Sequence, residues 1–330
     1  MFEKEQYAFV CCVESGALES QTLRMIESLR RWGGVFANMP VLAVIPRMGI
    51  PLASKTIHAF DRLQVDYLYF QNRDRYVWDK FLNKPYAVLA AENYFQSECI
   101  VWVDSDLLFV GEPEQLILSD EEDFVACASD KNIGTNGIDD TNAPYWQNAC
   151  QVVGLEIGSL PWVITEREQE RIRLYWNGGI FAYRRSTNFA QTYLDTCLCV
   201  YDSQVISCES GMYFHEQVSL GLAMLRGQLR WRSLNETHNY SFGSKTFEKW
   251  YCEEKLRTAK VLHYHDAMWD WFWDTFIDCL NKTHPDVADW AKTLGVMKNE
   301  APIQWRAIKK LLDLVYKQQQ SLYLKSCRIV

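Results

Sequence analysis

Short apolar runs alternate with amphipathic segments through the first part of the chain. Residues 7–13 (YAFVCCV) and 41–45 are apolar and rich in β-branched side chains, which predicts buried strands. Each run precedes a segment with helical periodicity, at 19–32 and 54–63, and the first of these ends at two glycines. Strands that alternate with helices in this way predict an α/β fold with a mainly parallel central sheet flanked by helices.

The same pattern continues along the rest of the chain. Further strands are predicted at 65–70, 100–103, 124–128, 180–183 and 261–268. Further helices are predicted from Lys84-Pro85 onward, at 187–200, at 214–225 and, as an amphipathic tail, at 303–322. Residues 129–144 are rich in Asn, Asp, Gly and Thr and predict a long loop, the kind of segment that often contacts substrate.

Two carboxylates follow the most clearly buried of these strands. Asp104 and Asp106 come directly after residues 100–103, and residues 107–110 are apolar again. Ligands bind at the carboxyl edge of an open α/β sheet, and hard oxygen donors there can share a divalent cation. Because unpaired charge between two buried segments is costly, the pattern predicts a metal–nucleotide site. A helix cap or a solvated turn is the structural alternative.

The overall composition bears on the partners, the cysteine chemistry and the location that we expect for this protein. The net charge is −8 and no Lys/Arg cluster is present, which argues against a nucleic-acid partner. The 11 cysteines lack C-x-x-C spacing, so we expect reduced thiols and no zinc site. Neither a signal peptide nor a transmembrane segment is recognisable, and we therefore expect a cytoplasmic protein. Contact with a membrane surface stays open.

Other polar residues stand at the ends of predicted elements. The first loop, 14–20, lacks both glycine-rich phosphate motifs, so phosphate must be held in another way. Asn177-Gly178-Gly179 precedes a strand, and Glu216-Gln217 opens a helix. His263 and His265, separated by Tyr264, stand at the end of the last predicted strand. We expect only one of these histidines to touch a metal. Each motif alone also has an ordinary structural explanation.

The order of these motifs resembles the GT-A fold glycosyltransferases, most closely the retaining group that includes glycogenin and the bacterial lipopolysaccharide galactosyltransferases. The resemblance covers roughly residues 7–270. It implies a catalytic domain over 1–270 that binds a nucleotide-sugar, with 271–330 as a helical extension packed on it. It also implies Mn²⁺, or Mg²⁺, as the cofactor.

Roles for individual residues come from the resemblance. Asp104, Asp106 and His263 would bind the metal, and the imidazole would favour Mn²⁺. Glu216 and Gln217 would flank the reacting anomeric carbon as the catalytic pair. The remaining correspondences are contacts to the donor nucleotide or its sugar, assigned to Val13, Glu14, Lys84, Asp104, Ser105, Asn177, Gly178, Gly179 and His265.

One departure from the family pattern concerns the leaving diphosphate. The family has a glycine and then Lys-Pro-Trp after the metal histidine, whereas this chain has Tyr264-His265-Asp266. The usual lysine contact is therefore missing, and His265, Arg184 or Arg185 could replace it.

The function we predict is a metal-dependent glycosyltransferase of the hexosyltransferase type. It moves a sugar from a nucleotide diphosphate, with UDP as the expected carrier, to an acceptor hydroxyl with retention of configuration. A non-catalytic nucleotide-sugar or carbohydrate-binding protein is the main alternative. A sugar-nucleotide pyrophosphorylase is less favoured because residues 14–20 (ESGALES) have one glycine and no basic residue.

Overall fold

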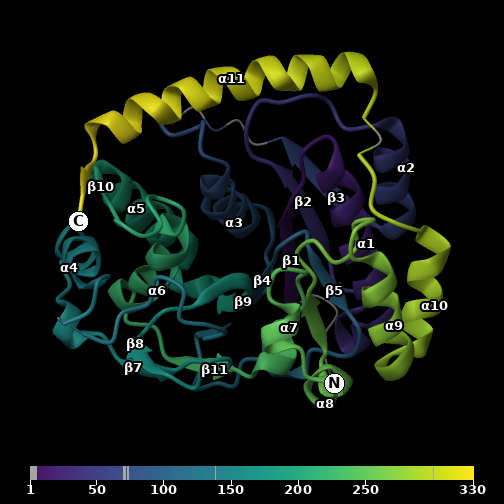
Figure 1. The fold of residues 1–330 in the computed structure, drawn as a ribbon, viewed down its shortest axis with the longest axis horizontal. Helices are drawn as coiled ribbons and strands as arrows, with labels where there is room; N and C mark the ends of the chain where they lie inside the picture. Colours follow the sequence, from purple (N-terminus) through teal and green to yellow (C-terminus); the bar gives the residue numbers. More distant parts are fainter. Residues whose placement is uncertain (1–5, 70–71, 73, 138, 300) are drawn as a thin grey trace.

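A seven-stranded sheet forms the centre of the computed structural model, which describes residues 6–69, 72, 74–137, 139–299 and 301–330 (Figure 1). Its strands are, in spatial order, β11 (Trp231–Leu234), β6 (Phe124–Cys127), β9 (Asn177–Arg184), β4 (Cys99–Val103), β1 (Tyr7–Cys12), β2 (Val41–Ile45) and β3 (Val65–Tyr69). Neighbouring strands are parallel except where β9 pairs with β4 and β6. The predicted fold class, α/β with a mainly parallel sheet flanked by helices, is confirmed.

Helices cover both faces of the sheet. They are α1 (Ala17–Trp32), α2 (Ser54–Leu63), α3 (Asn83–Tyr94), α4 (Ala143–Gln151), α5 (Phe189–Asp202) and α6 (His215–Arg226). Alternate residues of β1 face opposite sides: Tyr7 and Phe9 pack with α1 and α2, while Ala8 and Val10 pack with α3, α5 and α6. Both faces of β1 are therefore buried, which explains why its sequence is a continuous apolar run.

Most element boundaries agree with the predictions, with two differences. Asn177-Gly178-Gly179 lies inside β9 and not before it, because a register shift near Ala126 and Cys127 accommodates the glycines within the strand. The strand predicted at 261–268 is only β13 (Val261–His263), and a turn comes after it. The predicted end of β3 at Phe70 lies outside the described residues.

A small second sheet fixes the position of the segment after the acidic pair. Its strands are β12 (Tyr240–Ser241), β13 and β5 (Leu107–Phe109), in that order. β5 runs antiparallel to β13, with Leu107 opposite His263. This pairing brings Asp106 and His263 together although 157 positions (263 minus 106) separate them in sequence.

The C-terminal part is mainly helical, with α9 (Trp273–Thr283), α10 (Pro285–Leu294) and α11 (Ile303–Ser326) followed by β14 (Arg328–Ile329), which pairs with β10 (Val205–Ile206). α11 crosses the width of the molecule (Figure 1). The remaining elements are β7 (Trp162–Ile164), β8 (Arg171–Arg173), α7 (Phe247–Trp250) and α8 (Glu253–Thr258). The domain boundary at 270 stays a prediction.

Two further predictions concerned the state of the cysteines and the presence of a transmembrane segment. All 11 cysteines are free. Within the described ranges, no helix has the length and apolar character needed to cross a bilayer.

Candidate active site

The predicted motifs meet around one cavity of about 1030 Å³. It lies at the carboxyl edge of the central sheet, where β4 ends. Residues from every predicted motif line it, namely Glu14, Lys84, Asp104, Ser105, Asp106, Asn177, Glu216, Gln217, His263 and His265. The structure thus gathers segments that are far apart in the sequence.

Asp106 lies beside two imidazoles, and we call Asp106, His263 and His265 the histidine cluster. His263 Nε2 is 3.3 Å from Asp106 Oδ1, and His265 Nδ1 is 3.9 Å from Asp106 Oδ2. The two rings stack with centroids 4.0 Å apart. Both histidines therefore face the acid, and the expectation that only one of them touches a metal stays a prediction.

The second nitrogen of each ring has a neutral partner. His263 Nδ1 donates to Asn239 Oδ1 at 3.2 Å, and His265 Nε2 contacts Ser241 Oγ at 2.8 Å. Metal-binding histidines are typically oriented by such contacts. One ligand atom from each member of the cluster lies within 4.8 Å of the others, so one carboxylate and two imidazoles could hold an ion. The backbone of His265 is left-handed, with φ at 50°, a strained conformation common at functional sites.

The electrostatics of the histidine cluster are those of an ion pair. Burial favours the neutral acid, but the charge and hydrogen bond of His263 lower the pKa of Asp106 well below its usual range. Burial likewise favours a neutral imidazole, yet Asp106 raises the pKa of His263 above its ordinary value. The carboxylate of Asp106 thus favours a positively charged partner.

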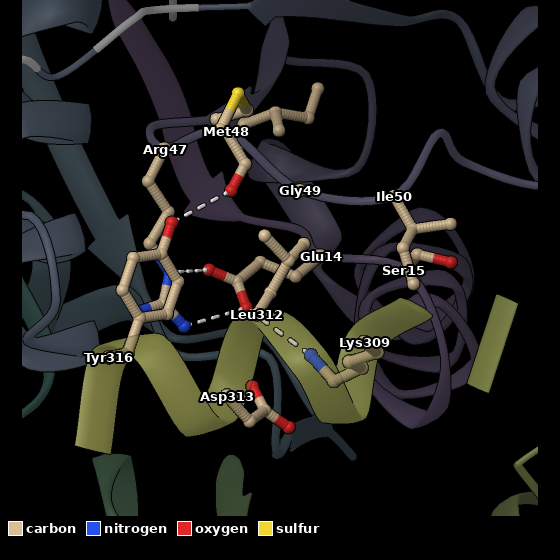
Figure 2. Close-up of a pocket in the computed structure, with 11 residues that line it drawn as sticks. Glu14, Ser15, Arg47, Met48, Gly49, Ile50, Lys309, Leu312, Asp313 and Tyr316 are labelled. Atoms are coloured by element: carbon tan, nitrogen blue, oxygen red, sulfur yellow. Dashed lines mark hydrogen bonds and ion pairs between the residues drawn. The ribbon is translucent and has the colours of Figure 1, made fainter. Parts of the chain in front are cut away.

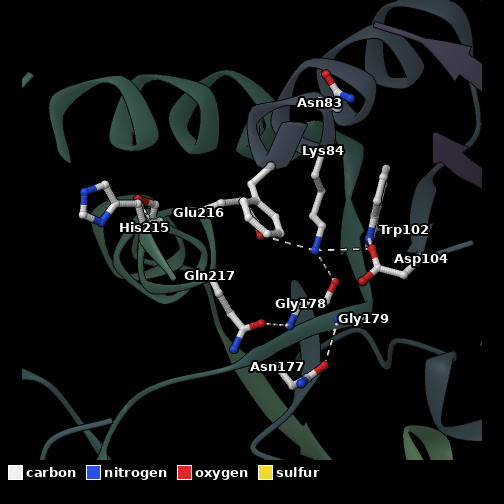
Figure 3. A network of polar contacts seen from close by, with 12 residues as sticks. Asn83, Lys84, Trp102, Asp104, Asn177, Gly178, Gly179, His215, Glu216 and Gln217 are labelled. Carbon is white, nitrogen blue, oxygen red and sulfur yellow. Dashed lines mark hydrogen bonds and ion pairs between the residues drawn. The ribbon is translucent and has the colours of Figure 1, made fainter. Parts of the chain in front are cut away.

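A second group, the lysine cluster, consists of Lys84, Asp104 and Glu216 (Figure 3). Lys84 Nζ is 3.4 Å from Asp104 Oδ1, 3.4 Å from Glu216 Oε2, and donates to the carbonyl of Gly178 at 2.8 Å. Trp102 Nε1 donates to Asp104 Oδ1 at 2.8 Å. Here a side chain of the protein already supplies the positive charge.

Glu216 is buried and the side chain of Lys84 is 11% exposed, whereas the side chain of Asp104 is 27% exposed. Burial raises the pKa values of Asp104 and Glu216, and Lys84 only partly offsets the effect. Burial disfavours the ammonium of Lys84, but Asp104 and Glu216 raise its pKa. Tyr193 also donates a hydrogen bond to Glu216.

The two glycines of β9 lie between the two clusters. A Cβ atom on Gly178 would be 2.7 Å from Lys84 Nζ, and one on Gly179 would be 2.8 Å from His263 Nδ1. Real Cβ atoms do not come this close to other atoms, so the absence of side chains lets both clusters approach the strand.

Side chains on either side of the glycines hold this strand in place. Asn177 Oδ1 accepts from Gly179 N at 2.9 Å, and Gln217 Oε1 accepts from Gly178 N at 3.3 Å. Gln217 also donates to the hydroxyl of Tyr175.

The first loop contributes Glu14 to the cavity. Glu14 pairs with Arg47 at 2.6 Å and accepts from Asn83 at 2.8 Å, and a smaller pocket beneath α11 shares it (Figure 2). Burial would raise the pKa of Glu14, but Arg47 lowers it below the usual range. The side chain of Val13 is instead packed in the core, and its backbone N–H donates to Val44.

The suggested replacement of the missing lysine by Arg184 or Arg185 is wrong. Arg184 pairs with Cys99 at the other end of β4, far from the acids, and it bonds to Glu98 and Glu122. Arg185 donates to the carbonyl of Ser97. Because β9 runs antiparallel to β4, its last residues lie at the edge opposite the cavity.

Sequence reasoning missed two residues of the site. Asp130 lines the cavity, and burial, only partly offset by Arg167, raises the pKa of its carboxyl to about 6. Its signal was present in the sequence, since it follows β6 as Asp104 follows β4. Asn239 links His263 to Asn177 Oδ1, to which it donates at 2.8 Å. No sequence signal pointed to Asn239, which precedes a strand of two residues.

Similarity to a known protein family defines the class of this chain. The model of the Rhodobacterales glycosyltransferase domain family matches residues 9–228, more than half of the chain. A search of curated protein sequences found no match. The class is therefore that of the glycosyltransferases, and the chain belongs to the Rhodobacterales glycosyltransferase domain family. The match includes Asp104, Asp106, Asn177 and Glu216, whereas His263 and His265 lie beyond it.

Solved structures of similar shape are also glycosyltransferases. The apo structure of the bifunctional glycosyltransferase WbbM has 12% identity and a TM-score of 0.48, over 87% of this chain and 51% of that one. The glycosyltransferase GlyE of Streptococcus pneumoniae TIGR4 has 14% identity and a TM-score of 0.49, over 90% of this chain and 66% of that one. The chain thus spans about half to two thirds of the length of these structures.

Proposed function

We propose that the protein transfers a sugar from a nucleotide diphosphate donor, with UDP as the carrier, to an acceptor hydroxyl in a metal-dependent reaction. The observation that carries this proposal is the histidine cluster, which combines one carboxylate and two imidazoles in the same cavity as Glu216 and Gln217. A metal bound beside these two side chains would suit transfer from a diphosphate, since the leaving group is strongly charged.

The donor set fits a first-row transition metal better than Mg²⁺. Imidazole nitrogen suits first-row transition metals, whereas Mg²⁺ prefers oxygen ligands, and among the two expected ions Mn²⁺ accepts a mixed set of carboxylate and imidazole more readily. Asp106, His263 and His265 would hold the ion, and Asp104 would be a further ligand, as the acidic pair predicts. When bound, the metal would neutralise charge on the departing diphosphate as a Lewis acid.

The chain's own side chains would bind and orient the donor. The side chain of Asn177 accepts hydrogen bonds from Gly179 N and Asn239, and the side chain of Gln217 accepts one from Gly178 N. Both side chains are therefore held in fixed orientations in which they would contact the donor sugar. Glu216, held by Lys84, would stabilise the positive charge that develops at the anomeric carbon. Glu14 would face the base or ribose. Retention of configuration is part of this proposal.

Ligand-dependent stability tests the proposal directly. We expect UDP with Mn²⁺ at about 100 times its dissociation constant to add about 2.7 kcal/mol to the free energy of unfolding, measured by thermal shift. Asp106→Asn should abolish the Mn²⁺-dependent part. Asp289→Asn, which alters an exposed acid paired with Lys292, serves as the control and should keep the full shift.

Donor hydrolysis then separates an enzyme from a binding protein. The glycosyltransferase proposal expects slow, Mn²⁺-dependent release of UDP from a UDP-sugar in the absence of acceptor. A thermal shift without release from any of the common UDP-hexoses would favour the non-catalytic alternative. No shift with UDP and Mn²⁺ would contradict both.

A further inference from the structure

The outer surface of α11 is unusually apolar. Of the 19 large apolar side chains exposed among the described residues, eight lie on this helix. They are Ile303, Trp305, Ile308, Leu311, Leu314, Val315, Leu322 and Leu324, with Ile303 81% exposed and Leu311 64% exposed. Single exposed apolar residues are ordinary, but a gathering on one element marks an interaction surface.

The helix cannot bury these residues by rotating, because its inner face is already occupied. The hydroxyl of Tyr316 donates to the carbonyl of Met48 at 3.1 Å, and Arg47 lies over its ring at 5.0 Å (Figure 2). Tyr323 is buried and donates to the carbonyl of Tyr201 at 2.8 Å. Residues 309, 316 and 323 recur every seven positions and define the docked side of the helix.

The opposite side carries the apolar stripe. At 100° per residue, Ile303, Leu311, Leu314, Val315 and Leu322 fall within about 120° of one another and face away from the docked side. They lie along one side of a helix of 24 residues, and the polar residues Gln304, Gln318, Ser321 and Lys325 stand among them.

Positive charge borders one edge of this stripe. Arg306, Lys310 and Lys317 are exposed and fall side by side on the helix surface. The sequence of α11 contains five Lys or Arg residues and one Asp, whereas the whole chain has a net charge of −8. A basic, apolar helix on an acidic protein indicates a partner that is both anionic and apolar.

We propose that the outer face of α11 binds the surface of an anionic lipid bilayer. An interfacial helix of this kind inserts its apolar side chains below the headgroups while Lys and Arg contact anionic lipids. A second copy of the chain is a poorer occupant, because self-association would bring two such sets of cations to one interface. The proposal does not depend on the proposed reaction, since the stripe faces away from the docked side of the helix and takes no part in the cavity.

Vesicle co-sedimentation tests this proposal on the full chain. We expect the wild type to bind vesicles of equal parts phosphatidylglycerol and phosphatidylcholine, and to bind pure phosphatidylcholine much more weakly. Leu311→Gln/Leu314→Gln should lower the partition coefficient at least tenfold, because two leucines leave the bilayer. Tyr69→Gln/Ile164→Gln, which alters two exposed apolar residues elsewhere, is the matched control and should bind like the wild type.

A charge variant gives an independent readout. Lys310→Glu/Lys317→Glu should weaken binding to the anionic vesicles and remove its dependence on salt. Circular dichroism and the UDP–Mn²⁺ thermal shift should be unchanged in all these variants, which separates this proposal from the catalytic one. The proposal is overturned if the wild type does not bind anionic vesicles. A wild-type dimer that Leu311→Gln/Leu314→Gln converts to monomer would overturn it in favour of a self-interface.

Discussion

The two clusters of the cavity begin from the same short motif and end in opposite electrostatic states. Asp104, in the lysine cluster, has a cation of the protein 3.4 Å away. Asp106, in the histidine cluster, faces two imidazoles, which need not be charged. One acid of the pair therefore lies beside a lysine of the protein, and the other lies beside two imidazoles.

This difference assigns distinct work to the two acids. The pKa of Asp104 is raised, chiefly by burial, and that of Asp106 is lowered by His263 in spite of burial. A carboxylate that already contacts Lys84 would have to give up part of this contact to bind a metal, so Asp104 would be the weaker ligand of the two. A group held as a carboxylate is suited to bind metal, since ligands must be deprotonated.

Removal of Lys84 should produce the largest effect on stability. Lys84→Met leaves the buried Glu216 and the partly buried Asp104 without their shared cation, and we expect the free energy of unfolding at pH 7 to fall by about 3 kcal/mol in urea denaturation. Adding Glu216→Gln to Lys84→Met should recover part of the loss, because one buried charge is removed.

A lysine with a similar partner but greater exposure is the control for this effect. Lys309 is 4.0 Å from Glu14, and its side chain is 41% exposed. Lys309→Met should therefore change stability by less than about 1 kcal/mol. Equal losses in the two variants would mean that Lys84 does not neutralise the buried acids.

The histidine cluster should show its coupling in a pH-dependent double-mutant cycle. Folding lowers the pKa of Asp106. The stability that Asp106 contributes to the folded state is therefore fully present above the usual pKa of an aspartate, and it is lost as the pH falls through the lower, folded-state pKa. Since the pKa of His263 is raised, its contribution is present below 6.5 and lost as pH rises through the folded-state value. In metal-free protein, Asp106→Asn and His263→Asn should thus couple by about 1 to 2 kcal/mol near pH 5.5, and by less near pH 9.

His238 and Glu114 provide the contrasting pair. Their side chains are 3.6 Å apart, but burial lowers the pKa of His238 to about 4. His238 is therefore neutral at pH 5.5, and the cycle with His238→Gln and Glu114→Gln should give little coupling there. A coupling for Asp106 and His263 that rises toward pH 9 would contradict the ion-pair description.

The lysine cluster was more accessible to sequence reasoning than the histidine cluster. Lys84 at a helix start, the acids after an apolar strand and Glu216 in a first helical turn are all local signals, because each stands at the end of a regular element. The expected sheet then places such ends at one edge. The central strands were predictable for the same reason, since burial on both faces leaves a continuous apolar run.

The histidine cluster depends on the pairing of two short strands that are far apart in the sequence, and no local sequence pattern predicts this pairing. Its geometry results from β5 and β13, strands of three residues each, too short to show a period. The turn after His263, with the left-handed His265, then directs both rings to Asp106. Likewise, Asn239 orients His263 from a segment without any motif. The arginine assignment was wrong because it ignored the direction of β9.

Smaller effects than the loss of Lys84 should come from the adjacent glycines, which lie between the two clusters. Gly179→Ala would press on the anchored ring of His263, so we expect a loss of about 2 kcal/mol in stability and weaker Mn²⁺ binding in a metal titration. Gly178→Ala would press on the end of Lys84 and approach Glu216 Oε1, neither of which belongs to the histidine cluster, so we expect a loss of about 1 kcal/mol in stability and an unchanged Mn²⁺ affinity. Gly158→Ala, which points into open space, is the control. Equal losses of Mn²⁺ affinity in both β9 variants would show that the clusters act as one site, with Asp104 contributing as much to the metal as Asp106.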